Sequence, residues 1–395
     1  MIISICILLS ACNGFQNQPP DPPEINNPVG NSTNNPVENS VGVDEKELPS
    51  IDDSPQKNQS IQEKAQQILK TMSLEEKVGQ MFIARCPEEN AAQAVANYHL
   101  GAYILFARDF QNKSRAEVTA NIQSYQAASK LGMLIGVDEE GGIVNRLSRY
   151  KQFRAVPFWA PQDLYAEGGW DLVISDTEEK AELLNSLGIN LNLAPVCDVP
   201  SSDTDYIYSR SFGTNATLTA QYVETVVATM NANQLGSVLK HFPGYGNNVD
   251  THTGVAYDNR SYEVFLENDF LPFIAGINAG AGAVLVSHNI VECMDPQSPA
   301  SLSKKVHQIL RDELNFDGVI MTDDLYMDAI KQFTGESNAA VLAVLAGNDM
   351  ICSTDFEIQI PAVIEAVRNT TISENTIDQS VMRILCWKLS LGIIQ

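Results

Sequence analysis

From residue 61 onward, short continuous apolar runs alternate with longer segments in which apolar residues recur every three or four positions. The apolar runs are GQMFIAR, GAYILF, GMLIGVD, INLNLAPV, GSVLKHF, GAVLVSH, GVIMTD and GNDMICS. Segments of helical period, such as RAEVTANIQSYQAASK, LTAQYVETVVATMNANQ and SKKVHQILRDELN, lie between most of them. Buried strands separated by amphipathic helices predict a parallel sheet covered on both faces. These units predict an α/β fold, a single (β/α)8 barrel of the TIM type over residues 61–395.

Two local signals refine this prediction. Ser73 and Glu76 have the spacing of a capping box, so a helix is expected to begin there, directly before the first strand. No G-x-G-x-x-G motif follows that first strand, and an open doubly wound sheet of the dinucleotide-binding kind therefore has no positive support.

The chain begins with MIISICILLSAC, an apolar run without a charged side chain. The run is shorter than the roughly 20 residues that a helix needs to span a bilayer, and it suits the core of a signal peptide. Its end, LSAC, resembles a bacterial lipobox, in which the cysteine is lipidated and becomes the first residue of the mature protein. The sequence therefore predicts a lipoprotein-type signal peptide over residues 1–12 that ends at Cys12. An ordinary cleaved signal or a frayed apolar terminus is the alternative.

Residues 13–60 are rich in Asn, Pro, Ser and acidic side chains and poor in large apolar ones. Such a composition cannot offset the entropy of ordering, so this stretch is predicted to be a disordered tether. Together with Cys12, the tether predicts an extracytoplasmic protein that is lipid-anchored to the bacterial cell membrane.

The chain has 49 acidic and 25 basic side chains, which gives a formal net charge of −24. This balance argues against a nucleic-acid partner, because phosphate binding needs an excess of Lys and Arg. Beyond the signal and lipid cysteines, the remaining thiols are Cys86, Cys197, Cys293, Cys352 and Cys386. They are odd in number, widely spaced and without a CxxC pair, so they indicate neither a zinc site nor a disulfide framework. Buried thiols are expected, and one disulfide stays open as an alternative.

Polar residues follow several of the predicted strands. In a barrel of this kind the carboxyl ends of the strands meet at one mouth, where the active site lies. The residues at these ends are Asp138, Glu139 and Glu140 (third strand), Asp198 (fourth), Lys240 and His241 (fifth), His288 (sixth), and Asp323 and Asp324 (seventh). Arg146 and Arg210 lie on the loops after the third and fourth strands, and Asp250 and His252 lie on the loop after the fifth. Three of the five histidines therefore fall at the expected mouth.

Four segments occur in order at these strand ends: VDEEGGIVNRL, SRSFG, KHFPGYG with the following DTH, and GVIMTDDLYMDA. Together they resemble the successive signatures of family 3 glycoside hydrolases, and more narrowly those of its single-domain β-N-acetylhexosaminidase branch. In that branch the aspartate after Ser or Thr at the end of strand seven is the nucleophile, which corresponds to Asp323 here. Its carboxylate would attack the anomeric carbon and hold the sugar covalently, so that one displacement becomes two.

The resemblance also implies an Asp-x-His pair as acid and base, and here that pair is Asp250 and His252. Imidazole titrates near neutrality, so His252 can protonate the leaving oxygen and later deprotonate water, while Asp250 orients the ring. Gly244 and Gly246 would give this loop the freedom to close and open. A solvated His–Asp pair without a catalytic role is the alternative interpretation of the spacing.

The same resemblance assigns recognition of the sugar to five residues: Asp138, Arg146, Arg210, Lys240 and His241. Carboxylate and guanidinium groups suit a hydroxyl-rich ligand because each can hold two oxygen-bearing groups. For the two arginines, an ion-pair network at the barrel mouth is the alternative description. The adjacent Asp324 is expected to support the nucleophile, and His288 is given no role.

Several positions depart from the family pattern. Tyr245 stands where the family loop usually has a second His, residues 247–248 are Asn-Asn instead of Asp-Thr, and the segment before Asp250 is one residue shorter. Glu139 replaces a common Gln and adds a negative charge beside Asp138, which bears on specificity more than on chemistry.

The sequence thus predicts a retaining exo-β-N-acetylglucosaminidase that releases terminal N-acetylglucosamine from cell-wall (peptidoglycan) fragments or related glycans. No cofactor or metal is implied, a monomer is expected, and the partners are the glycan and, through Cys12, the membrane. The alternatives are a phosphorylase that uses the same dyad, a β-glucosidase of the same family, and a non-catalytic sugar-binding lipoprotein. A metal-dependent hydrolase built on His241, Asp250 and His252 is a further and weaker alternative.

Overall fold

The computed structural model describes residues 55–248, 256–334 and 339–394. Its main sheet consists of the parallel strands β1 (Phe82–Arg85), β2 (Ala102–Leu105), β3 (Leu134–Val137), β4 (Leu191–Asn192), β5 (Gly236–Phe242), β7 (Ala283–Val286), β9 (Val319–Thr322) and β10 (Ile351–Ser353). Each strand lies inside one of the apolar runs of the sequence. Their order is β10-β1-β2-β3-β4-β5-β7-β9, and a parallel bridge between Met321 and Met350 joins the two ends. The predicted (β/α)8 barrel is confirmed.

Every residue of these eight strands is buried except Arg85, the last residue of β1. One face of each strand points into the barrel and the other packs under helices, so neither face meets water. This double burial explains why the runs are continuously apolar instead of alternating. Large side chains such as Phe82, Tyr103 and Phe242 fill the interior.

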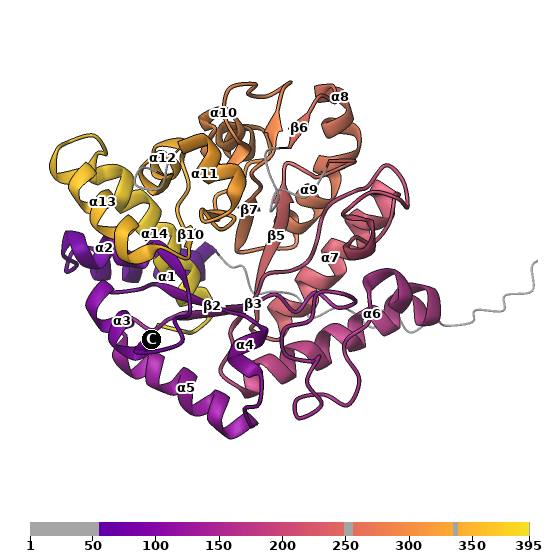
Figure 1. The fold of residues 1–395 in the computed structure, drawn as a ribbon, viewed down its shortest axis with the longest axis horizontal. Helices are drawn as coiled ribbons and strands as arrows, with labels where there is room; N and C mark the ends of the chain where they lie inside the picture. Colours follow the sequence, from indigo (N-terminus) through magenta and orange to yellow (C-terminus); the bar gives the residue numbers. More distant parts are fainter. Residues whose placement is uncertain (1–54, 249–255, 335–338, 395) are drawn as a thin grey trace, which may run out of the picture. The chain divides into compact units, whose positions relative to one another are not determined.

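Helices follow the strands in the predicted alternation, and Figure 1 shows them arranged around the sheet as the chain proceeds from indigo to yellow. They are α3 (Ala91–Tyr98) after β1, α4 (Ala107–Phe110) and α5 (Arg115–Ala128) after β2, α6 (Pro161–Ser186) after β3, α7 (Ala216–Ala232) after β4, α8 (Tyr262–Val264) and α9 (Phe270–Asn278) after β5, α10 (Lys304–Gln308) after β7, α11 (Asp328–Thr334) and α12 (Ala339–Ala346) after β9, and α13 (Phe356–Arg368) and α14 (Glu374–Ser390) after β10. The helix expected over residues 303–315 consists of α10 continued by a π-helical turn, Ile309–Glu313.

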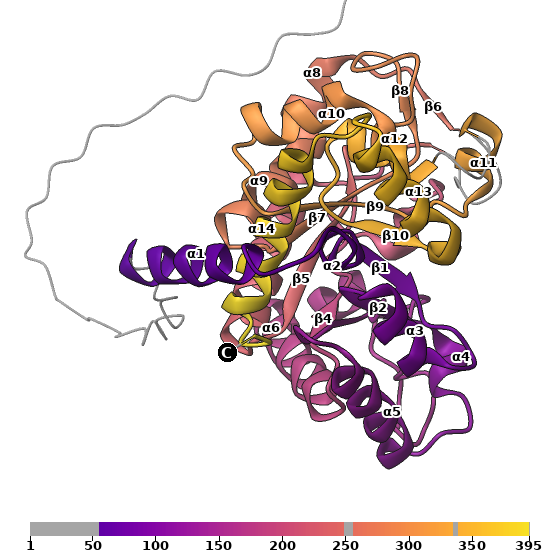
Figure 2. The same ribbon diagram turned by 90° about the vertical axis from the view of Figure 1, so that its left-hand side faces the viewer.

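Two helices precede the first strand. Helix α1 (Pro55–Leu69) begins before residue 61 and packs against α14, as Figure 2 shows. Helix α2 (Leu74–Gln80) begins at the predicted capping box. The N–H of Glu76 donates to Ser73 Oγ at 3.2 Å, and the N–H of Ser73 donates to Glu76 Oε2 at 2.9 Å. The capping box is therefore confirmed.

Beyond the carboxyl ends of β5 and β7, a small parallel pair forms between β6 (Tyr257–Asp258) and β8 (Ile290–Val291). Together with the long loop that follows β3, this pair builds up the side of the barrel at which the predicted polar residues collect. Within the part of the chain that the structure describes, no helix is both long and apolar enough to cross a lipid bilayer.

Candidate active site

A cavity of about 520 Å³ lies at the carboxyl ends of the strands. Six of the residues predicted for the site line it: Asp138, Arg146, Arg210, Lys240, His241 and Asp323. They come from β3, from the loops after β3 and β4, from β5 and from the end of β9, so the barrel brings together side chains that are far apart in the sequence. The exposed Tyr206, Ile143 and Tyr326 add apolar surface at the rim. The cavity therefore combines charged groups with apolar faces, which suits a sugar.

Asp323 follows the last residue of β9 and is half-buried at the cavity wall. Its backbone N–H donates to the carbonyl of Val286 at 3.1 Å, and its Oδ1 accepts from the N–H of Asp324 at 2.8 Å. The first bond ties the backbone of Asp323 to the barrel rim, and the second holds its carboxylate. A strand-end carboxylate fixed in this way has the position that a nucleophile at the mouth requires.

Behind it, Asp324 connects two neighbouring strand ends. Its carboxylate accepts hydrogen bonds from the hydroxyl of Thr354 at 2.6 Å, from the N–H of Thr354 at 3.1 Å and from the N–H of Tyr326 at 3.0 Å. Asp324 also lines the cavity. Its contacts brace the loop after β9, and its expected support of the nucleophile stays a prediction.

A buried network of charges forms the opposite wall. Lys240 Nζ lies 2.7 Å from Asp138 Oδ1 and 2.6 Å from Glu140 Oε1. Arg210 donates to the same Glu140 through Nε at 3.0 Å and Nη2 at 2.7 Å. Arg146 Nη2 reaches Asp138 Oδ2 at 3.5 Å. The ion-pair network considered for the two arginines is present, and the same side chains line the cavity.

Three members of this network, Glu140, Lys240 and Arg210, are charged throughout the ordinary pH range. Burial by itself would raise the pKa of the Glu140 carboxyl, but Arg210 and Lys240 outweigh burial and hold it well below its usual range. Burial would lower the pKa of Lys240 and Arg210, yet their carboxylate partners raise both. The wall therefore presents fixed, ionised donors and acceptors to a ligand.

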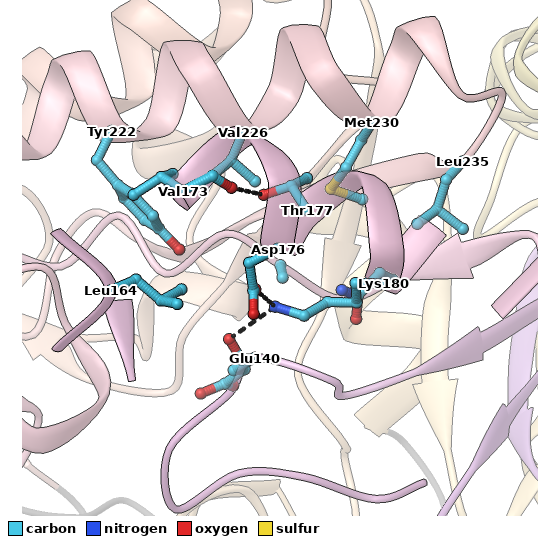
Figure 3. A pocket seen from close by; sticks show the side chains of 12 residues that line it. Glu140, Leu164, Val173, Asp176, Thr177, Lys180, Tyr222, Val226, Met230 and Leu235 are labelled. Carbon is cyan, nitrogen blue, oxygen red and sulfur yellow. Dashed lines mark hydrogen bonds and ion pairs between the residues drawn. The ribbon is translucent and has the colours of Figure 1, made fainter. Parts of the chain in front are cut away.

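Figure 3 shows the support behind this wall, a cavity of about 20 Å³ between α6 and α7. Lys180 on α6 lies 3.2 Å from Asp176 Oδ2 and donates to the backbone carbonyl of Glu140 at 3.4 Å. The space is large enough for about one water molecule. Its lining fixes the backbone of Glu140 from behind the charged network.

His241 is held by groups on both ring nitrogens. Nδ1 lies 2.7 Å from Asp198 Oδ2, and Nε2 lies 3.2 Å from Arg210 Nη2. Because a guanidinium can only donate, Nε2 must accept, so Nδ1 carries the proton and donates to Asp198. Asp198 is fully buried and also accepts from the N–H of Tyr245 at 2.7 Å. His241 is thus oriented at the end of β5 and has no ring nitrogen left for a metal ion.

The side chain of Glu139 does not line the cavity, so the negative charge expected beside Asp138 is not presented to the cavity. Its side chain is fully buried, and it accepts hydrogen bonds from the backbone N–H groups of Arg146, Leu147 and Ser148 and from the Ser148 hydroxyl. The carboxylate therefore organises the loop after β3. Through its bond from the Arg146 N–H, it also helps to set the position of that residue.

The proposed acid–base pair, Asp250 and His252, lies outside the described residues. The chain on either side of that gap is firmly held: Asn248 donates to Asp258 at 2.6 Å, and Arg260 pairs with Asp258 at 2.7 Å. Arg260 also pairs with Asp269 at 3.0 Å. The two stems of the loop therefore share one buried anchor.

The two glycines of the loop stem have a packing role that the sequence did not show. Gly244 (φ +124°) and Gly246 (φ +51°) both have positive φ. A Cβ on Gly244 would lie 2.2 Å from Asp269, and one on Gly246 would lie 2.3 Å from Arg260. Both glycines are thus required for close approach to the anchor, apart from any freedom that they give the loop.

The remaining predictions concern histidine, cysteine and metal. His288 is fully buried, with Nδ1 2.7 Å from Ser301 Oγ and Nε2 3.1 Å from the carbonyl of Asp324, and it does not line the cavity. The five cysteines of the described chain are free thiols, so no disulfide forms among them. Within the described ranges, no three His, Cys, Asp or Glu side chains gather as metal ligands.

Sequence reasoning missed two parts of the site. Glu140 was noted only as a strand-end acid, yet it joins Arg210 to Lys240. Arg85 lies at the end of β1 and lines the same cavity, but nothing distinguished it in the sequence from other charged residues. The one available signal was its place as the last residue of an apolar strand run.

The comparison with protein families identifies one match. The model described as "Glycosyl hydrolase family 3 N terminal domain" matches residues 73–386. A curated relative named "Beta-hexosaminidase", from Xanthomonas campestris pv. campestris (strain B100), is 32% identical over 275 residues, which cover 68% of this chain and 81% of the relative.

Solved structures give the same result. A family 3 β-N-acetylglucosaminidase from Paenibacillus sp. has a TM-score of 0.76 and 31% identity over 82% of this chain, which spans 63% of that protein. A β-N-acetylhexosaminidase from Beutenbergia cavernae has a TM-score of 0.72 and 27% identity, covering 81% of this chain and 99% of that protein. The closed eight-stranded barrel, its charged mouth and these matches lead to one conclusion: the chain belongs to glycosyl hydrolase family 3 and is a glycoside hydrolase.

Proposed function

We propose that the protein is a retaining exo-β-N-acetylglucosaminidase that uses Asp323 as its nucleophile. The observation that carries this proposal is the position of Asp323, which lies on the wall of the same cavity as the charged network of Asp138, Glu140 and Lys240. The names of the relatives, β-hexosaminidase and β-N-acetylglucosaminidase, support the choice of sugar.

The reaction would proceed in two displacements. In the first, a carboxylate oxygen of Asp323 bonds to the anomeric carbon, the bond from that carbon to the leaving oxygen breaks, and His252 gives the leaving oxygen a proton. In the second, His252 takes a proton from water, whose oxygen displaces the carboxylate. The sugar leaves with its original β configuration because each displacement inverts the anomeric carbon.

The charged wall would hold the sugar while this happens. Asp138 and Glu140 offer acceptors to hydroxyl groups, and Lys240 and Arg210 offer donors, all of them already fixed by one another. Fixed donors and acceptors need little reorganisation when a ligand binds, which favours a rigidly placed anomeric carbon. His241, held by Asp198, would contribute to the same recognition.

Asp250 would orient His252 and stabilise its protonated form, as the acid member of a triad does. The anchoring of both loop stems through Arg260 supports this assignment. A catalytic acid on a loop must come back to the same position in each reaction cycle, and fixed stems favour this. The sugar donors are proposed to be cell-wall fragments or related glycans, and the protein is proposed to act outside the cell from a lipid anchor at Cys12.

An assay with chromogenic substrates tests the function. The protein should release the aryl group from an aryl β-N-acetylglucosaminide much faster than from the matching β-glucoside, and NMR should show the β anomer of N-acetylglucosamine first. Asp323→Asn should lower kcat by at least about a thousandfold, while Asp171→Asn, an exposed aspartate on α6, serves as the matched control.

Three results would contradict the proposal. A sugar phosphate as the main product in phosphate buffer would make the protein a phosphorylase. Full activity of Asp323→Asn would remove the nucleophile. A preference for the β-glucoside would instead indicate the alternative glucosidase, with the same nucleophile and a different sugar.

A further inference from the structure

The loop that connects β3 to α6 differs in charge from the rest of the chain. Residues 141–162 contain four basic side chains and no acidic one, although the whole chain has a formal net charge of −24. A local reversal of sign on a strongly acidic protein creates a confined positive potential at its surface. This stretch therefore suits an anionic partner, which the remaining surface repels.

Two of the four basic side chains are already used within the protein. Arg146 lies 3.5 Å and Arg154 lies 2.8 Å from a carboxylate oxygen. Arg149 and Lys151 are exposed, and neither forms an ion pair with an acidic residue of the described ranges. The charges of Arg149 and Lys151 are therefore available to a partner outside the chain.

Two further cations, from the start of α5, extend this positive surface. The side-chain amide of Gln152 donates to the backbone carbonyl of Lys113 at 3.2 Å, and Arg115 donates to the carbonyl of Phe153 at 3.4 Å. These bonds hold the start of α5 against the loop. No ion pair joins either cation to a carboxylate in the part of the chain that the structure describes. The four cations that form this basic cluster are Lys113, Arg115, Arg149 and Lys151.

The same loop exposes three large apolar side chains. Ile143 is 71% exposed, Val156 is 56% exposed and Trp159 is 46% exposed. The N–H of Gly142 donates to the carbonyl of Phe158 at 2.9 Å, so the turn that carries Ile143 lies beside the segment that carries Val156 and Trp159. These three side chains form an apolar edge on the loop. Apolar side chains that gather at a surface indicate a contact with something other than water.

The combination of the basic cluster with the apolar edge distinguishes between two kinds of anionic partner. At a membrane surface, Lys and Arg contact lipid phosphates, while Trp and aliphatic side chains enter the boundary between headgroups and acyl chains. A soluble polyanion would contact the cations alone and leave the apolar edge in water. The exposed Trp159, Ile143 and Val156 therefore favour a lipid surface.

We propose that the loop after β3 docks on an anionic lipid bilayer, with the apolar edge at the level of the headgroups and the basic cluster against the lipid phosphates. This inference goes beyond the proposed function and does not depend on it. Ile143 also lines the catalytic cavity, so docking would hold the mouth of that cavity beside the bilayer. The same lipids repel the acidic remainder of the surface, which favours this orientation over others.

Flotation with lipid vesicles tests the proposal. The full chain with Cys12→Ser, which lacks the proposed lipid site, should bind vesicles that contain phosphatidylglycerol more strongly than vesicles of phosphatidylcholine alone. High salt should remove this difference, because it screens exposed charges. In the same background, the double variant Arg149→Gln and Lys151→Gln should bind the anionic vesicles about tenfold more weakly or less, since each basic side chain near an anionic surface strengthens association about fivefold.

The double variant Lys304→Gln and Lys305→Gln is the matched control. It removes two exposed, adjacent cations from α10, outside the loop, and changes the net charge by the same amount. Its binding to the anionic vesicles should equal that of the Cys12→Ser chain. Both double variants should keep the midpoint of thermal unfolding, so that a loss of binding is not a loss of the fold.

Tryptophan fluorescence reports the position of the apolar edge directly. The chain has three tryptophans. Trp170 packs against the rings of Tyr165 and Phe212, and Trp387 is only 7% exposed. Anionic vesicles should therefore shift the emission to shorter wavelength through Trp159, and Trp159→Phe should abolish the shift.

Three results would overturn the proposal. The first is equal weakening of vesicle binding in the two double variants. The second is an emission spectrum that anionic vesicles leave unchanged. The third is binding to a soluble polyphosphate that depends on Arg149 and Lys151 while vesicles are not bound, which would make the loop a site for a soluble polyanion.

Discussion

Glu140→Gln should destabilise the protein strongly, because Glu140 is the shared partner of two buried cations. The substitution keeps the size and shape of the side chain and removes its charge. Arg210, which contacts Glu140 through two nitrogens at 3.0 and 2.7 Å, would lose its ion pair, and Lys240 would keep only Asp138. The side chain of Glu140 is 3% exposed, so water cannot replace the lost charge.

The expected magnitude follows from this geometry. Removing one partner of a buried ion pair costs about 3–5 kcal/mol, because it leaves an uncompensated charge. The lower end, about 3 kcal/mol, is expected here, since Asp138 still neutralises Lys240 and a Gln oxygen still accepts from Arg210. At about 2–4 °C for each kcal/mol, the midpoint of thermal unfolding should fall by roughly 6–12 °C.

Glu179→Gln is the matched control. Glu179 also accepts two hydrogen bonds from one arginine, Arg154, at 2.8 Å each, but its side chain is 53% exposed. Exposed ion pairs contribute about 0–1 kcal/mol, so this variant should unfold close to the wild type. The two substituted glutamates therefore differ mainly in how deeply their side chains are buried.

Urea unfolding followed by circular dichroism measures both variants, and pH gives a second test. Because Arg210 and Lys240 outweigh the effect of burial and lower the pKa of Glu140, its stabilisation is complete above the ordinary carboxyl pKa of 4.5 and is lost as the pH falls further. The deficit of Glu140→Gln should therefore be constant near neutral pH and shrink in acid. A deficit below about 1 kcal/mol at neutral pH, equal to that of Glu179→Gln, would refute the buried network.

Further predictions concern the loop stem and the loop. Gly246→Ala should destabilise the protein by about 2 kcal/mol or more and lower kcat, since its Cβ would overlap Arg260. Gly392→Ala, at a position after α14 that also has positive φ but open space around it, should cost only about 1 kcal/mol in the same unfolding assay. Burial raises the pKa of Asp269 to about 7 although Arg260 opposes it, so its contribution is full below the ordinary value of 3.8 and is lost as the pH rises through about 7. The stability of the wild type relative to Asp269→Asn should therefore decline from about pH 4 to about pH 8, and a flat difference would contradict the raised pKa. His252→Ala should slow substrates with poor leaving groups about a hundredfold more than activated aryl glycosides, and equal losses would exclude its role as acid.

The scaffold could be predicted from the sequence because its signal is local. Each barrel strand is buried on both faces, and Phe82 to Ala84 show how this produces an uninterrupted apolar run. The end of such a run fixes where the next polar residue lies, so Asp323 and Lys240 could be placed at the mouth before the structure was known. The capping box at Ser73 is local in the same sense.

The direction of individual side chains could not be predicted in this way. Glu139 and Glu140 are identical neighbours, yet one organises the loop after β3 and the other joins two cations in the wall. Which of them faces the cavity depends on the path of the backbone after Val137, and that path is set by distant contacts. Likewise, no periodic pattern in the sequence reveals that Gly246 lies close to Arg260.

The identity of the atom that bonds to the sugar is the most direct test of the account. The protein would be incubated with a fluorinated N-acetylglucosaminyl fluoride, which forms the glycosyl-enzyme quickly and breaks it down slowly, and then analysed by intact and peptide mass spectrometry. We predict one added sugar for each chain, on the peptide that contains Asp323, and none in Asp323→Asn. A sugar attached to a different residue, or rapid turnover of β-N-acetylglucosaminides with no labelled aspartate at all, would contradict the mechanism.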